Sequence, residues 1–91
     1  MTPEDKEKSL KDAKIAKNKG DLDKALQLVT DVVKAEPQNV DANWIAAWIL
    51  ARKDDPALAI GQFERVMKLG LDSGRVKEAS AAVRRLKARE S

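Results

Sequence analysis

The sequence repeats itself with a period of 34 residues, and this period restricts the possible folds more than any other feature. Alanine recurs with this spacing at Ala13, Ala47 and Ala81, and a branched apolar residue recurs at Ile15, Ile49 and Val83. The same offset pairs further apolar positions, namely Ala25 with Ala59, Leu26 with Ile60, Val29 with Phe63, and Val32 with Val66. A period of this length indicates copies of one supersecondary unit that bury their apolar faces against one another.

Each repeat unit has the pattern of two helices. Apolar residues follow the i, i+3, i+4, i+7 spacing of an amphipathic helix, and no segment alternates as a strand does. Capping residues and proline precede the segments, and glycine or proline ends them. The signals are Thr2-Pro3 and Gly20 for the first helix, Asp21 and Pro37 for the second, Asn39 for the third (about 40–53), Asp55-Pro56 and Gly70 for the fourth, and a turn at Asp72-Ser73-Gly74 before the fifth (75–90). Short connections favour antiparallel neighbours.

The third of these helices is apolar on nearly every side. It holds Trp44 and Trp48, whose spacing of four residues places them on one face of a helix. Ile45 and Ile49 form a second apolar stripe beside them. Because a helix of this kind is usually buried on most sides, we expect the other helices to pack around it.

Composition limits the chemistry. The 91 residues suffice for one domain, residues 1–91. Histidine and cysteine are both absent, so disulfides and the common nucleophile–base pairs are excluded, and we expect neither an enzyme nor a bound metal or other cofactor. No apolar run approaches the roughly 20 residues that cross a bilayer, and the first residues do not resemble a signal peptide. We therefore expect a cytoplasmic protein with no membrane role.

Positive charge is concentrated in the last helix. The whole chain carries a net charge of +3, and residues 75–91 alone carry six basic and two acidic side chains. No base-reading motif and no aromatic platform accompany these basic residues, so specific nucleic-acid binding is not expected. The helix is better suited to contact with an acidic protein surface.

The period and the residues that carry it resemble the tetratricopeptide repeat family. The matching positions of repeat one (about 6–39) are Ala13, Gly20, Ala25 and Pro37, and those of repeat two (about 40–73) are Ala47, Leu50, Ala59, Phe63 and Val66. Asn43 stands where the family often has tryptophan, and the last segment (about 74–90) resembles the family's C-terminal capping helix. The resemblance implies an all-α fold, an α-solenoid of five antiparallel helices in a right-handed superhelical stack.

The resemblance also implies a function. In this family the first helix of each hairpin lines a concave surface that binds a peptide or a protein, so the chain is expected to act as a scaffold or adaptor. The residues that the register places on this surface are Leu10, Lys14, Lys17, Asn18, Asp41, Trp44, Trp48, Arg52, Arg75, Glu78, Ala82 and Arg85. Some members hold the C-terminal carboxylate of chaperone peptides in a clamp of Lys, Asn and Arg. Because Lys14, Leu10 and Ile45 occupy clamp positions here, that clamp is not expected.

Two questions remain open from the sequence, namely the role of the tryptophans and the possibility of self-association. Trp44 and Trp48 can fill space in the core, line a groove for a partner, or form the contact of a homodimer. Self-association is the main alternative function, since two repeats are fewer than the usual minimum of about three and a second copy would complete the stack.

Overall fold

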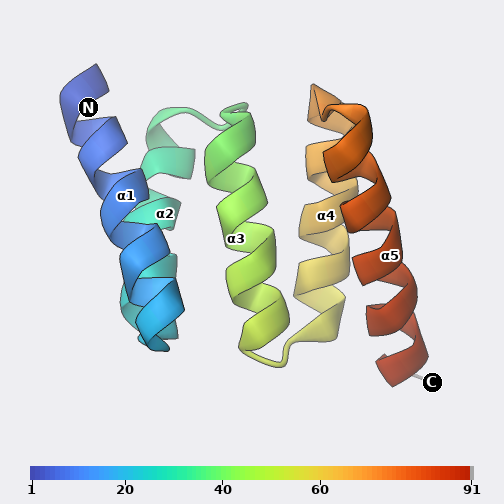
Figure 1. Cartoon of the computed structure of the whole chain (residues 1–91). Coiled ribbons are helices and arrows are strands. Elements are labelled where there is room, and N and C mark those ends of the chain that lie inside the picture. Colours follow the sequence, from blue (N-terminus) through green and yellow to red (C-terminus); the bar gives the residue numbers. More distant parts are fainter. Residues whose placement is uncertain (91) are drawn as a thin grey trace.

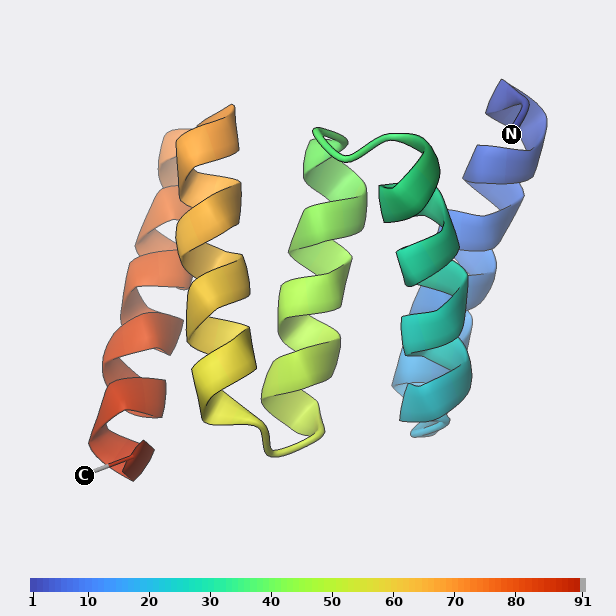
Figure 2. The same ribbon diagram turned by 180° about the vertical axis from the view of Figure 1, so that it is seen from behind.

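The computed structural model describes residues 1–90, and over these residues the fold is all-α, as the sequence predicts. The helices are α1 (Pro3–Lys19), α2 (Leu22–Ala35), α3 (Val40–Arg52), α4 (Pro56–Gly70) and α5 (Ser73–Glu90). Each helix packs against the next one along the chain, and α1 also contacts α3. In Figure 1 the helices stand side by side in chain order, with α1 and α5 nearer to the viewer than α2 and α4. Figure 2, the view from behind, has α2 and α4 in front.

Local capping determines where the helices begin. Each predicted cap accepts a hydrogen bond from the backbone N–H three residues later, as in Thr2 Oγ1 with Asp5 (3.1 Å) and Asn39 Oδ1 with Ala42 (2.9 Å). Asp21 and Asp55 cap α2 and α4 in the same way. These bonds satisfy N–H groups that have no partner inside the helix, so the four predicted starts are confirmed.

The predicted turn at Asp72-Ser73-Gly74 is wrong for Ser73 and Gly74, which are helical. Asp72 Oδ1 accepts from the backbone N–H of Arg75 at 2.8 Å, and the Asp72 carbonyl accepts from Val76 at 2.9 Å. Asp72 therefore acts as the N-cap, and Ser73 and Gly74 belong to the first turn of the helix. The predicted end of α3 differs by one residue. The helix ends at Arg52, and Lys53, predicted as its last residue, is the C-cap.

The core consists of two clusters that share α3. The first cluster joins α1 and α2 to one side of α3, through Ala42, Ile45, Ala46 and Ile49. The second joins α4 and α5 to another side of α3, through Ala47 with Trp44 and Trp48 packed beside it. The prediction that the other helices pack around this apolar helix is therefore confirmed.

One predicted apolar position of α1 is largely exposed. Ile15 is 43% exposed, whereas Ile49 and Val83, at the same place in the 34-residue register, are 0% and 8% exposed. Ile49 is buried because α3 packs this side of the helix against the first cluster. On α1 the register places the charged Lys11 where α3 has the buried Ile45, so this side of α1 faces solvent.

Asn43 is the only buried polar residue among those that the structure describes, and its side chain is fully hydrogen-bonded. Its Nδ2 donates to the carbonyls of Asn39 (2.7 Å) and Pro37 (3.1 Å), and its Oδ1 accepts from Gln62 Nε2 at 2.7 Å. Because Pro37 lies in the α2–α3 connection and Gln62 on α4, one side chain links three parts of the chain. A buried amide is tolerated when its donors and acceptors are paired in this way.

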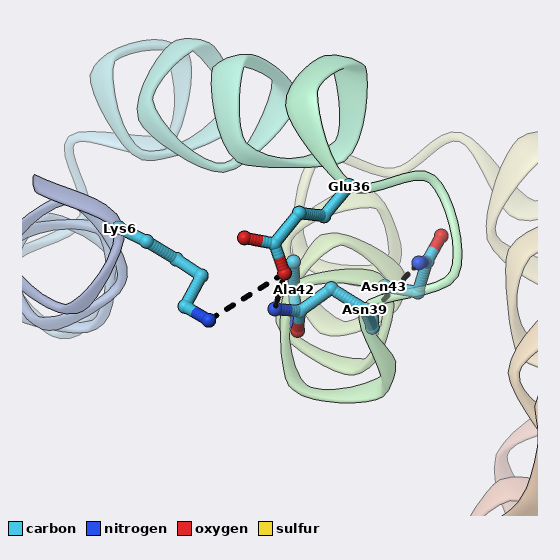
Figure 3. Close-up of polar contacts among 5 residues, drawn as sticks. All are labelled: Lys6, Glu36, Asn39, Ala42 and Asn43. Carbon is cyan, nitrogen blue, oxygen red and sulfur yellow. Dashed lines mark hydrogen bonds and ion pairs between the residues drawn. The ribbon is translucent and has the colours of Figure 1, made fainter. Parts of the chain in front are cut away.

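A second group of polar contacts attaches α1 to the same connection (Figure 3). Lys6 Nζ lies 3.5 Å from Glu36 Oε1, and Asn39 Nδ2 donates to the same oxygen at 3.3 Å. Asn39 thus caps α3 with its oxygen while its nitrogen binds Glu36. The α2–α3 connection is held from both sides, by α1 through Glu36 and by α4 through Asn43.

Replacing the buried amide should therefore cost stability. We expect Asn43→Ala to lower the free energy of unfolding by about 1–3 kcal/mol, since the variant loses the three hydrogen bonds of a fully buried side chain, to the carbonyls of Asn39 and Pro37 and to the Gln62 amide. Urea denaturation followed by circular dichroism measures this change. Asn18→Ala is the matched control, because Asn18 is exposed on α1, and its effect should stay within about 0.5 kcal/mol. Equal stability of Asn43→Ala and wild type would contradict this account.

The same Gly→Ala change should have opposite effects at two positions. Gly20 ends α1 with φ +87°, where a side chain is strained, so we expect Gly20→Ala to destabilise by about 1 kcal/mol. Gly61 lies within α4, and an added Cβ meets no atom within 4 Å, so Gly61→Ala should stabilise by about 0.5–1 kcal/mol. Thermal melting curves of the two variants measure both changes in melting temperature. Changes of equal sign would contradict the left-handed conformation of Gly20 or the helical conformation of Gly61.

Candidate functional site

Side chains of α1, α3 and α5 come together on one face, which we call the α1–α3–α5 face. Two contacts connect its helices. Arg52 Nη1 donates to the Lys17 carbonyl at 2.6 Å and links α3 to the end of α1. Arg75 Nη1 lies 3.1 Å from Asp41 Oδ1 and links α5 to the start of α3. Most of the residues predicted from the register fall into groups at the two ends of this face.

At the end where α3 begins, Trp44 is covered by a cation. The Arg75 guanidinium lies 5.5 Å from the centre of the Trp44 ring, in the geometry of a cation–π contact. Arg75 is fixed there by its ion pair with the exposed Asp41. Glu78, the other predicted residue at this end, is exposed on α5. The face of the Trp44 ring under Arg75 is therefore not open to a ligand unless Arg75 moves.

Both tryptophans form part of an aromatic cluster with Phe63 of α4. The ring centres of Trp48 and Phe63 are 5.0 Å apart, those of Trp44 and Phe63 are 6.0 Å apart, and those of the two tryptophans are 5.7 Å apart. All three pairs are edge-to-face, with interplanar angles of 80–84°. Phe63 is fully buried, whereas Trp44 and Trp48 are half-buried. Each tryptophan thus contributes to the second core cluster and also keeps part of its surface exposed.

Beside Trp48 the face contains an open hollow of about 220 Å³. Its apolar walls come from α3 and α5, and two arginines stand at its rim; the lining residues are Trp48, Ala51, Ala82, Arg85, Leu86 and Arg89. Arg89 also forms an ion pair with Asp54 in the α3–α4 connection. The register predicted Trp48, Ala82 and Arg85 for the binding surface, and the structure places them together here.

The other lining residues were missed by the register. Arg89 lies one helical turn beyond Arg85, and the register assigns neither Leu86 nor Ala51 to the concave surface. Helical spacing from the predicted residues would have indicated Arg89, since residues four apart share a face. The position of α5 beside Trp48, which completes the hollow, is not encoded in any local pattern.

At the end of α1, three cations lie close together. Lys17 is half-buried, and Lys14 and Arg52 are near enough to influence its charge. Burial, followed by the positive charges of Arg52 and Lys14, lowers the pKa of the Lys17 ammonium from its ordinary value of 10.5. We call Lys14, Lys17 and Arg52 the basic cluster.

Two predicted residues of α1 lie outside these groups. Leu10 is half-buried and packs against the first core cluster, so it mainly supports the fold. Asn18 is exposed beside Lys17 at the end of the helix.

Two further findings concern only the residues that the structure describes. Their acidic side chains form no group of three or more that could hold a metal ion. None of their helices is both long enough and apolar enough to cross a membrane.

Comparisons with models of known protein families, with curated proteins and with solved structures find no match to this chain.

The lowered pKa of Lys17 predicts how stability depends on alkaline pH. Between the lowered pKa and 10.5, the unfolded chain keeps a proton at Lys17 that the folded chain has lost, so this group makes stability rise as the pH increases. Lys17→Gln should remove this contribution, and Lys14→Gln should reduce it because one neighbouring charge is gone. Urea denaturation of the three proteins at a series of alkaline pH values measures the slopes. Identical slopes for wild type and Lys17→Gln would show that Lys17 is not perturbed.

Proposed function

We propose that this chain is a protein-interaction module that binds a peptide segment of another protein on the α1–α3–α5 face. We further propose that its five helices form two antiparallel hairpins of the tetratricopeptide kind, stacked as a right-handed α-solenoid and capped by α5. Support for this architecture comes from the 34-residue register and from the contacts of each helix with the next. A scaffold or adaptor role in the cytoplasm agrees with the absence of cysteine from the sequence.

The observation that carries this proposal is the hollow at Trp48. A half-buried tryptophan, apolar walls and two arginines are gathered at one place on the face. Tryptophan and arginine are the residue types most enriched in the energetic centres of protein interfaces. With about 220 Å³, the hollow is smaller than the 300–1,000 Å³ typical of drug-sized ligand sites and suits a single side chain of a partner.

The side chains of this face favour binding over catalysis. The groups beside the hollow are arginine and lysine, and the sequence has no histidine or cysteine to act as a base or a nucleophile. We therefore propose a role without catalysis and without a cofactor.

The test starts from peptides selected on the full chain from a displayed library of random peptides. The best peptide is then titrated against wild type and three variants by fluorescence anisotropy. Trp48→Leu keeps an apolar side chain against Phe63, and Arg85→Glu changes an exposed residue, so both should fold, which circular dichroism verifies. We expect each to weaken binding by about tenfold or more, which is about 1.4 kcal/mol. Leu58→Ala, the control, removes a 59% exposed apolar side chain from α4 and should change affinity by less than about twofold.

Other outcomes would overturn the proposal. Selection of no peptide, or equal affinity for all four proteins, would exclude this face as the binding site. A dimer seen by light scattering and lost in Arg85→Glu would show that a second copy of the chain occupies the face.

A further inference from the structure

The charges next to the hollow identify the chemical class of its partner. Lys14, Lys17 and Arg52 lie together, and Arg52 directs one donor to a carbonyl and none to a carboxylate. Among the side chains that the structure describes, those of residues 1–89, no acidic group pairs with any of these three cations. Three like charges repel one another, and the partial burial of Lys17 adds to this cost. A bound anion would relieve both effects.

The rim of the hollow has the same sign. Arg85 is exposed and, like the basic cluster, makes no ion pair within the described part of the chain. Arg89 is partly neutralised by Asp54. By contrast, the acidic residues of the face, Asp41 and Glu78, lie at the far end beside Arg75. The face is therefore basic around the hollow and mixed in charge around Trp44.

The hollow and the basic cluster are adjacent. Trp48 and Arg52 are four residues apart on α3, so they lie one turn apart on the same side of the helix. Arg52 in turn reaches α1 through the Lys17 carbonyl. A short extended segment can therefore place one side chain in the hollow and the next side chains beside the three cations.

We propose that this face binds an acidic peptide segment, with a bulky apolar side chain in the Trp48 hollow and Asp or Glu side chains against Lys14, Lys17 and Arg52. This inference rests on the proposed function and specifies its partner. It differs from capture of a peptide's terminal carboxylate, because the anions are side chains beside an apolar anchor. It also requires nothing of Arg75, which is already engaged with Asp41 and Trp44.

A peptide fits this site better than a nucleic acid. The phosphates of a nucleic acid could pair with these cations. Proteins that bind single strands, however, also stack the bases on open aromatic faces. Trp44 is covered by Arg75, and Trp48 is held edge-to-face against Phe63 beside walls of Ala51, Ala82 and Leu86. Small aliphatic walls around one tryptophan are suited to an aliphatic or aromatic side chain.

The selected peptides themselves give the first readout. We expect them to be enriched in Asp and Glu and to share one bulky apolar residue. Replacing their acidic residues by Asn and Gln, or the shared apolar residue by Ala, should weaken binding to the full chain by about tenfold in fluorescence anisotropy. Binding should also weaken as salt increases, because exposed charges are screened.

A pair of charge-matched variants locates the effect. Lys14→Glu changes the basic cluster at an exposed residue and should lower the affinity for the acidic peptide by about tenfold. Lys68→Glu makes the same change of net charge on α4 and should lower this affinity by less than about threefold. Equal losses in the two variants would reduce the effect to the overall charge of the chain and overturn the inference.

The remaining outcomes separate this inference from the proposed function. Neutral or basic peptides that depend on Trp48 but not on Lys14 would overturn the acidic partner and leave the binding module in place. Failure to select any peptide would overturn both. Displacement of the selected peptide by poly(U) RNA at physiological salt, with loss of RNA binding in Lys14→Glu, would reassign the site to a nucleic acid.

Discussion

The whole structure depends on the burial of α3 from two sides. Its residues Ile45 and Ile49 belong to the core formed with α1 and α2, while Ala47 belongs to the core formed with α4 and α5. A chain of this length has little apolar surface to bury, so a helix that serves two cores at once is an efficient solution. The buried Asn43 restrains the rotation of that helix, because its amide bonds to the Pro37 carbonyl of the α2–α3 connection and to the Gln62 side chain of α4.

The sequence predicted those parts of the fold that depend on local interactions. A cap such as Asn39 bonds to its own helix, and the apolar faces follow from helical spacing, so both can be identified without knowledge of distant contacts. Asn43 could not be identified in this way, because its burial depends on Gln62, 19 residues away along the chain. The exposure of Ile15 has a related cause. The repeat shows that Ile15 and Ile49 are equivalent in register, but not that only one of them has a neighbouring helix.

The sequence predicted which residues share one face at the candidate site, but it did not predict the hollow. The register correctly placed Trp48, Ala82 and Arg85 near one another. It could not distinguish Trp44 from Trp48, since both occupy the same side of α3. Their difference arises from the side chains of α5, because Arg75 lies over the Trp44 ring, whereas Trp48 lies beside the hollow. The reach of single side chains and the placement of neighbouring helices decide such details, and neither follows from the period of the sequence.

The uneven distribution of aromatic residues has a practical consequence. The chain has two tryptophans, one phenylalanine and no tyrosine, and all three aromatic rings lie in the second core cluster. Intrinsic fluorescence therefore observes only one half of the molecule, whereas far-ultraviolet circular dichroism observes all five helices. The two signals will change together only if both halves unfold as a single cooperative unit. A comparison of the two signals therefore measures, without any added label, how strongly the unfolding of the two core clusters is coupled.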